Sequence, residues 1–249
     1  MLEPDVDLAR ATSYGSAAAL YDTHRPAYSA GLLDDLAALS PGEALDIGCG
    51  TGMVAAALAD RGVSVLGVEP DEQMAAVARG HGVSIEVAPF ETWDDAERQF
   101  DLVTCGAAWH WIDQARGTAK AARVLRQGGT FARFYNFELP EEPAISALET
   151  VYSKHAPRLM PYVPVPRDDF PDPVAVSDAF SAVETAIYPW SRTVSAQEWV
   201  GMVTTFSDHQ RLGADSLAEL QQAISSAIET VGGTVTTSGG TYVLLARRT

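Results

Sequence analysis

Three glycines follow one short apolar segment, and this arrangement constrains the fold more than any other feature of the chain. Residues 43–48 read EALDIG, and Gly48, Gly50 and Gly52 alternate with other residues at and after the end of that segment. A short apolar run that ends in glycine is typical of a buried strand that turns tightly into a helix. Glycine leaves the backbone of such a turn bare, so a ligand can lie against it at the helix N-terminus. The sequence therefore predicts an α/β domain with a small-molecule site after its first strand.

Strand-like and helix-like segments alternate through the middle of the chain. Strands are predicted at 43–48, 64–69, 83–88, 100–106 and 129–137, and helices at 53–62, 71–80 and 113–126. The last of these helices is expected to begin at Asp113 and to end in basic residues and Gly128-Gly129, as helix C-termini prefer. Strands separated by helices imply right-handed βαβ units and one parallel sheet with helices on both faces.

The flanking segments complete a single domain over residues 1–249. Helices broken at Pro26 are expected in the N-terminal 8–38, two more helices near 195–206 and 215–231, and edge strands at 183–190 and 241–248. The predicted fold class is α/β: a Rossmann-like three-layer sandwich of a mostly parallel seven-stranded sheet with an antiparallel C-terminal strand, and N-terminal cover helices.

Six prolines between Pro157 and Pro173 mark a segment that can be neither a helix nor a central strand. Such a long loop is either a functional lid or a surface crossover, and we favour the lid. We therefore assign a cofactor-binding core to about 40–137 and a substrate cap to about 138–180, together with the N-terminal helices 8–38.

Composition excludes several classes of protein. The chain has 17 Lys and Arg against 33 Asp and Glu, a formal net charge of −16, and no basic run, so a nucleic-acid partner is not expected. Its two cysteines lack zinc-site spacing, which predicts no metal and a reducing compartment. Neither a signal peptide nor an apolar run of about 20 residues is visible, so we expect a soluble cytoplasmic protein, a monomer or a homodimer.

Two carboxylates indicate which kind of ligand binds at the glycine turn. Glu69 ends the second strand, where a carboxylate can accept hydrogen bonds from both hydroxyls of a ribose. That position suits an adenosine cofactor of either the NAD or the S-adenosylmethionine type. The glycine order is GxGxG rather than GxGxxG, and Asp46 lies two residues before Gly48. A carboxylate there repels a pyrophosphate and attracts an ammonium group, which favours S-adenosylmethionine.

The segments LDIGCGTG (45–52) and VLGVEPDEQM (65–74) resemble the first two motifs of class I S-adenosylmethionine-dependent methyltransferases of the small-molecule type. YDTHRPAY (21–28) resembles the segment that covers the cofactor in that group. AAWHWID (107–113) resembles the trans-aconitate-methyltransferase-like branch, whose members mostly methylate small acids or hydroxyl compounds. The chain departs from the pattern after the third strand, where many relatives have a GDAE-like turn that meets the adenine and this sequence has APFETW (88–93).

The resemblance implies a set of cofactor contacts. Asp46 and the glycine turn would hold the methionine portion, Glu69 the ribose, and Arg25 a carboxylate of the cofactor or of an acidic substrate. Met74 and Phe90 would enclose the adenine, although apolar residues at such positions also serve as core. The expected cofactor-binding residues are Arg25, Asp46, Gly48, Cys49, Gly50, Gly52, Glu69, Pro70, Met74, Phe90, Glu91, Cys105 and Ala107. We expect the two cysteines to be small buried residues beside the cofactor rather than a redox pair.

The run AAWHWID follows the fourth strand at its carboxyl end, where open α/β sheets bind ligands. His110 is the candidate catalytic residue, as a base that deprotonates the acceptor or as a group that orients it; the alternative is a histidine bonded to local backbone. Tyr21, Trp109 and His209 are the candidate substrate-binding residues, with a helix-ending role as the alternative for the segment around His209.

The predicted reaction is direct displacement at the sulfonium methyl group by an oxygen of a small molecule, either a hydroxyl or a carboxylate. Methylation of nitrogen or carbon is an alternative within the same class. Two other classes stay open at this point: an NAD(P)-dependent oxidoreductase, which GxGxG and Asp46 disfavour, and a non-catalytic S-adenosylmethionine-binding protein. The chemistry needs no metal, because the sulfonium charge already activates the methyl group, so positioning and exclusion of water supply much of the acceleration.

Overall fold

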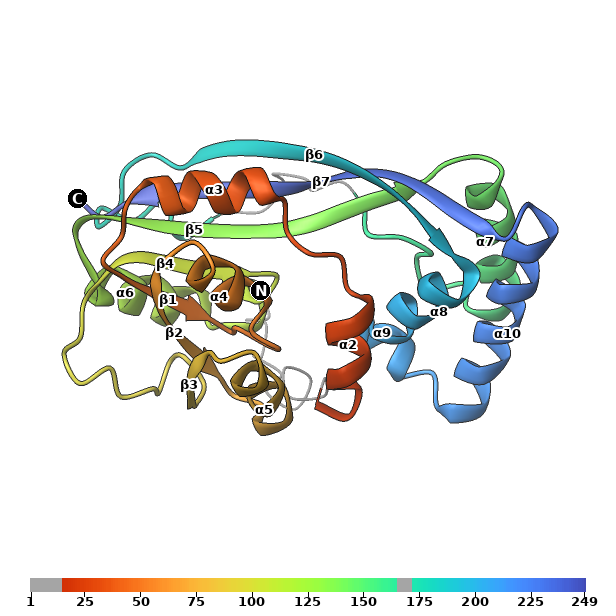
Figure 1. The fold of residues 1–249 in the computed structure, drawn as a ribbon, viewed down its shortest axis with the longest axis horizontal. Coiled ribbons are helices and arrows are strands. Elements are labelled where there is room, and N and C mark those ends of the chain that lie inside the picture. Colours follow the sequence, from red (N-terminus) through yellow and green to blue (C-terminus); the bar gives the residue numbers. More distant parts are fainter. Residues whose placement is uncertain (1–14, 165–171) are drawn as a thin grey trace.

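The structure is a computed structural model that describes residues 15–164 and 172–249 (Figure 1). The first part of the predicted N-terminal helices and the middle of the proline-rich segment lie outside the described residues. Within them, seven strands form one sheet in the order β3-β2-β1-β4-β5-β7-β6.

The strands are β1 (Glu43–Ile47), β2 (Ser64–Glu69), β3 (Ser84–Val87), β4 (Phe100–Gly106), β5 (Leu125–Pro140), β6 (Glu184–Ser195) and β7 (Thr234–Arg247). The helices are η1 (Gly15–Ala17), α2 (Ala18–His24), α3 (Ala30–Ala38), α4 (Met53–Ala59), α5 (Glu72–Gly80), η2 (Trp109–Trp111), α6 (Gln114–Val124), α7 (Ala144–His155), α8 (Ala196–Thr204), α9 (Ser207–Gln210) and α10 (Ala214–Thr230).

The strand directions confirm the predicted fold class. Strands β1 to β5 pair in parallel, whereas β7 runs antiparallel to both of its neighbours, β5 and β6. One hydrophobic cluster lies between the sheet and α6, and another between the sheet and helices α3 and α4. The parallel register also places β4 beside the strand that leads into the glycine turn, with Asp46 of β1 opposite Thr104 of β4.

The predicted end of the helix after Asp113 is wrong. Helix α6 begins where expected, with the Asp113 side chain accepting a hydrogen bond from the Arg116 backbone N–H at 2.9 Å, but it ends at Val124. Leu125 is fully buried and already pairs with Phe100 of β4, so the chain enters β5 at once. Gly128-Gly129 instead lie within β5, next to the shift in register between β4 and β5.

Strands β5, β6 and β7 extend beyond the other strands, and a group of helices, α7 to α10, lies at their far end (Figure 1). These helices share one hydrophobic core, in which Trp199 of α8 and Leu148 of α7 are fully buried. The predicted cap included α7 but none of α8 to α10, although residues from α8 and α10 pack in the same core. We call α7, α8, α9 and α10 the helical group.

No helix in residues 15–164 or 172–249 is both long enough and apolar enough to cross a membrane.

Candidate cofactor and acceptor site

The turn after β1 requires glycine at each alternate position. Gly48, Gly50 and Gly52 have φ values of 60°, 56° and 82°, in the left-handed region that side chains disfavour. A Cβ atom on Gly48 would lie 2.5 Å from Cβ of Ala108, and one on Gly52 would lie 2.9 Å from Cβ of Ala78. The turn is therefore closely packed against the segment after β4 on one side and against α5 on the other.

Asp46 is the best-placed partner for a cation. Its side chain is buried, Oδ1 accepts a hydrogen bond from the Thr104 hydroxyl at 2.7 Å, and Oδ2 has no partner among the described residues. Burial raises the pKa of Asp46 to about 7. A buried carboxylate with one oxygen unused is unfavourable by itself, and an ammonium group that reaches it would supply the missing hydrogen bond and charge.

Glu69 is buried at the end of β2 and holds two backbone groups. Its carboxylate accepts hydrogen bonds from the N–H of Gly50 at 2.9 Å and of Asp71 at 3.0 Å. Asp71 in turn caps α5 by accepting from the N–H groups of Gln73 and Met74. Burial raises the pKa of Glu69 to about 7. Each carboxylate oxygen keeps a lone pair, so Glu69 can fix the glycine turn and still accept hydrogen bonds from a ribose.

A cavity lies between Asp46 with the glycine turn and Tyr21 of α2. Its lining residues are Tyr21, Tyr28, Asp46, Gly48, Cys49, Gly50, Thr51, Met53, Val54 and Gly106. The enclosed space, about 20 Å³, has room for about one water. This space is too small for a cofactor, and Tyr21 of α2 and Tyr28 after it are among the residues that close it, which is consistent with the predicted covering role of the N-terminal segment.

Tyr28 is a site residue that sequence reasoning missed. Its phenol ring packs edge-on against Phe134 with ring centroids 4.8 Å apart, and burial raises its pKa well above the usual value. A Cβ atom on Gly106 would lie 2.8 Å from the Tyr28 oxygen, so only glycine fits at the end of β4 beside this side chain. Tyr28 is part of the segment 21–28 on which the resemblance partly rests, but the predicted site residues of that segment are only Tyr21 and Arg25.

Thr104 was also missed, although a signal for it existed. Once β1 and β4 are taken as parallel neighbours, the register places a β4 residue beside Asp46, and a hydroxyl there is a natural hydrogen-bond donor. The two cysteines are buried and free, as predicted, and burial raises the pKa of both thiols.

Arg25 does not line the cavity. Its guanidinium donates hydrogen bonds to the hydroxyl of Thr205 at 2.7 Å and to the carbonyl of the same residue at 3.2 Å. The rings of Phe206 and Tyr21 lie 4.5 and 4.9 Å from its central carbon. Arg25 therefore links the end of α2 to the turn between α8 and α9. This contact with Thr205 was not predicted from the sequence.

The predicted adenine contacts fall into two groups. Met74 is buried with its Cε 3.4 Å from the position of a Cβ atom on Gly50, and Pro70 directly follows Glu69, so both lie beside the glycine turn or the ribose carboxylate. Phe90, by contrast, stacks on Trp93 in the core under α6, with centroids 6.4 Å apart. Glu91 accepts a hydrogen bond from the Asp113 N–H at 2.8 Å, which fixes the loop after β3 to the start of α6.

In the turn after β4, Trp109 packs against the core, whereas His110 is exposed. Ala107 has a φ of 52°, unusual for a residue other than glycine, and donates its N–H to the carbonyl of Phe134. Trp109 packs edge-on against Phe131, 5.0 Å between centroids, and belongs to the margin of the core. His110 is exposed and lies against the ring of Trp111, 4.5 Å between centroids, and it does not line the cavity.

His209 is buried in the helical group and does not line the cavity either. Its Nε2 lies 2.7 Å from the phenol oxygen of Tyr152, and its Nδ1 has no partner in the described part of the chain. Burial lowers the pKa of His209 to about 4, so the ring is neutral at pH 7. The two residues join α9 to α7.

No group of three or more His, Cys, Asp or Glu side chains in residues 15–164 and 172–249 is arranged to hold a metal ion.

The comparisons with known proteins agree with this geometry. A family model described as a methyltransferase domain matches residues 45–132. An uncharacterized methyltransferase of Mycobacterium tuberculosis is 28% identical over 198 residues, 78% of this chain and 76% of the relative. A ubiquinone biosynthesis O-methyltransferase of Pseudomonas aeruginosa is 35% identical over 105 residues, 39% of this chain and 45% of the relative. A solved structure from Anaeromyxobacter dehalogenans, described as a type II methyltransferase, is 26% identical, with a TM-score of 0.65 over 90% of this chain and 97% of that one.

Proposed function

Since the chain belongs to the class I S-adenosylmethionine-dependent methyltransferases, we propose that it methylates an oxygen of a neutral small molecule, a hydroxyl or a phenol. The oxidoreductase alternative is excluded by the same family membership. S-adenosylmethionine is the cofactor, and when bound it supplies a methyl group activated by its sulfonium charge.

The residues around the glycine turn fit this cofactor. The unused Oδ2 of Asp46 suits the ammonium group of the methionine portion, because a buried carboxylate gains both a hydrogen bond and a counter-charge from it. The glycine turn offers a backbone surface without side chains. In our proposal Asp46 holds the ammonium group, Glu69 the ribose hydroxyls, and Tyr21 and Tyr28 cover the site and exclude water.

One observation carries the choice of a neutral acceptor. The cavity lining contains Asp46 but no basic residue. The nearby cations are already engaged: Arg25 with Thr205, and Arg133 of β5 with Asp172 at 2.8 Å. An acidic acceptor would therefore meet negative charge without a counter-charge, whereas a hydroxyl or phenol avoids this repulsion. The similarity to an O-methyltransferase supports oxygen as the methylated atom.

A neutral acceptor must lose a proton as it reacts, and we propose that His110 is the base that accepts this proton. This residue follows the cavity residue Gly106 by four positions, on the turn at the carboxyl end of β4. Its exposure leaves the imidazole accessible for exchange of the proton with solvent.

We also propose that the proline-rich segment covers the acceptor side of the cleft. The described residues on both sides of its central part contact β5: the carbonyl of Val163 accepts a hydrogen bond from Glu138, and Asp172 pairs with Arg133. A cytoplasmic protein that does not act on nucleic acid is consistent with the net charge of −16.

A screen of phenolic, alcoholic and acidic metabolites with methyl-labelled cofactor, read by mass spectrometry of the products, tests the proposal. The expected products are methyl ethers of hydroxyl compounds. Methyl esters or N-methyl products alone would show that the acceptor assignment is wrong. Binding of the cofactor without turnover on any acceptor would favour a non-catalytic protein instead.

A further inference from the structure

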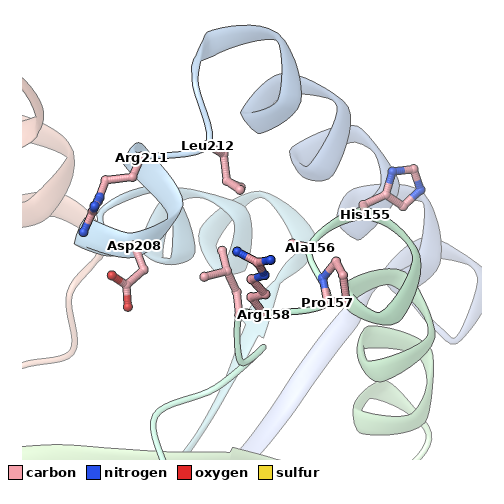
Figure 2. Close-up of a pocket in the computed structure, with 8 residues that line it drawn as sticks. His155, Ala156, Pro157, Arg158, Asp208, Arg211 and Leu212 are labelled. Carbon is pink, nitrogen blue, oxygen red and sulfur yellow. The ribbon is translucent and has the colours of Figure 1, made fainter.

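A second cavity lies in the helical group, and none of its lining residues lines the cavity at Asp46. It has a volume of about 420 Å³ and is lined by His155, Ala156, Pro157, Arg158, Leu159, Asp208, Arg211 and Leu212 (Figure 2). The turn after α7 forms one side of it, and α9 with the residues after it forms the other. Its volume lies within the range of small-molecule sites, about 300–1,000 Å³.

The inner surface of this cavity is apolar. Leu159 and Leu212 are half-buried and pack against the core of the helical group. Figure 2 shows the Leu212 side chain pointing between the two sides of the cavity. Pro157 adds a further apolar surface at the turn. A ligand with an aromatic or aliphatic body can therefore bury that body here.

The rim of the cavity carries two arginines that have no partner among the described residues. Arg158 and Arg211 are exposed, and neither guanidinium has a hydrogen bond or an ion pair among the described residues. Other arginines of the chain, such as Arg98 and Arg192, are each bound to a carboxylate. In Figure 2, Arg158 extends from the turn after α7 into the space between the two sides of the cavity, whereas Arg211 extends outward from the other side, where Asp208 also lies.

The charges at the rim favour a single negative charge on the ligand. Two arginines and one aspartate leave one positive charge beside the cavity, in a chain whose formal net charge is −16. A guanidinium can bind a carboxylate through two parallel hydrogen bonds, which suits it to an organic acid better than to a neutral ligand.

We propose that this cavity is a second ligand site that binds a small amphipathic monoanion, an aryl or alkyl carboxylate. The apolar body of the ligand lies on Leu159 and Leu212, its carboxylate lies beside Arg158, and Arg211 adds positive charge at the same rim. The site is distinct from the methyl-transfer cleft, whose lining has no basic residue and whose proposed acceptor is neutral.

Titration of the full chain with 2-naphthoate, followed by calorimetry at low salt, tests the proposal, and 2-naphthamide serves as the uncharged analogue. We expect saturable binding of the carboxylate and weaker binding of the amide. Arg158→Ala and Arg211→Ala should each weaken 2-naphthoate binding about fivefold, the upper range for an exposed ion pair. Arg116→Ala, which removes an exposed arginine of α6, should leave binding unchanged.

The proposal would be overturned by a dissociation constant weaker than about 10 mM, by equal binding of the acid and the amide, or by arginine variants that bind like Arg116→Ala. Competition between 2-naphthoate and S-adenosylhomocysteine would also overturn it, because the acid would then occupy the cofactor site. Both arginines are exposed and make no ion pair within residues 15–164 and 172–249, so thermal unfolding of the variants should match that of the wild type and verify that the loss is local.

Discussion

Thr104 donates its hydroxyl hydrogen to Oδ1 of Asp46 across 2.7 Å, while Oδ2 of the same carboxylate has no partner among the described residues. One strand thus fixes the orientation of a side chain on its neighbour and leaves the second oxygen of that side chain unused beside the cavity. The orientation is set before any ligand binds, which reduces the entropy lost on binding.

Cofactor affinity should fall as the pH drops below about 7. In the free protein burial raises the pKa values of Asp46 and Glu69 to about 7, so both carboxyl groups take up protons below that pH. Asp46 must lose its proton before it can bind an ammonium group, which lowers the affinity by up to about tenfold for each further pH unit. Calorimetry from pH 5.5 to 8 should show weak binding and a smaller pH dependence for Asp46→Asn. Wild-type affinity that is constant over this range would contradict the assignment.

Asp46→Asn should nevertheless stabilise the free protein at pH 8. The pKa of Asp46 is raised from its ordinary value of 3.8 to about 7, so the folded state binds a proton that the unfolded state has lost between these pH values. Folding stability therefore falls as the pH rises from about 4 to about 7, and the full penalty remains above pH 7. Asparagine cannot ionise, so the variant escapes this penalty. Thermal unfolding without cofactor should give a higher melting temperature at pH 8, by about 2–4 °C per kcal/mol, and no difference near pH 4. A variant that melts at or below the wild-type temperature at pH 8 would show that the ionised Asp46 side chain does not destabilise the folded state.

Glu69→Ala should weaken the binding of S-adenosylmethionine by about 30- to 1,000-fold. The estimate takes about 1.5–3 kcal/mol for each of two hydrogen bonds to a charged group, of which about 2–4 kcal/mol in total remains after water compensates in part. Glu72→Ala, which removes an exposed carboxylate of α5 paired with Arg79, is the matched control and should bind normally. Calorimetry showing unchanged affinity for Glu69→Ala would refute the ribose assignment.

Gly48→Ala should be far more damaging than Gly62→Ala. Both glycines have positive φ values, 60° and 85°, so alanine is strained at either position by about 1–2 kcal/mol. A Cβ atom on Gly62 meets nothing within 4 Å, whereas one on Gly48 collides with Cβ of Ala108. Denaturant unfolding together with cofactor titration measures the difference. Equal losses of stability and of cofactor affinity in the two variants would mean that the contact with Ala108 has no additional effect.

For a hydroxyl or phenol acceptor, kcat/KM should rise with pH and level off as the imidazole of His110 becomes neutral. His110→Ala should then lower the rate by about 10²- to 10⁴-fold, the usual contribution of a positioned base. Arg116→Ala on the following helix α6 is the control and should keep the full rate. For a carboxylate acceptor the rate should be flat or should fall as the pH rises. A rising limb that persists unchanged in His110→Ala would exclude His110 as the base.

The parts of the fold that depend on local pattern could be predicted from the sequence. Strands β1 to β4 and the glycine turn follow from short apolar runs and from residues that tolerate positive φ. The boundary of α6 was misjudged because Gly128-Gly129 suggested a helix end, whereas the burial of Leu125 against β4 decides it. Tertiary pairing outweighed a local signal there.

The site was harder to predict wherever distant segments meet. Arg25 and Thr205 are 180 positions apart, and Tyr152 and His209 are 57 apart, so no local pattern indicates that they touch. Asp46 was identified because its chemistry, next to the glycines, is informative without its neighbours. The hydrogen bond that the Glu69 carboxylate accepts from the backbone was not predicted, because it depends on how the turn folds back over β2.

The position of β7 between β5 and β6 has a consequence for synthesis of the chain. β6 precedes β7 in the sequence, so it leaves the ribosome before the strand beside which it lies in the sheet. Until residues 234–247 emerge, the outer edge of β5, a 16-residue strand, stays open to other nascent chains. At about 5–20 residues per second this interval lasts several seconds. A chaperone that covers the edge of β5 would protect the chain most during that time.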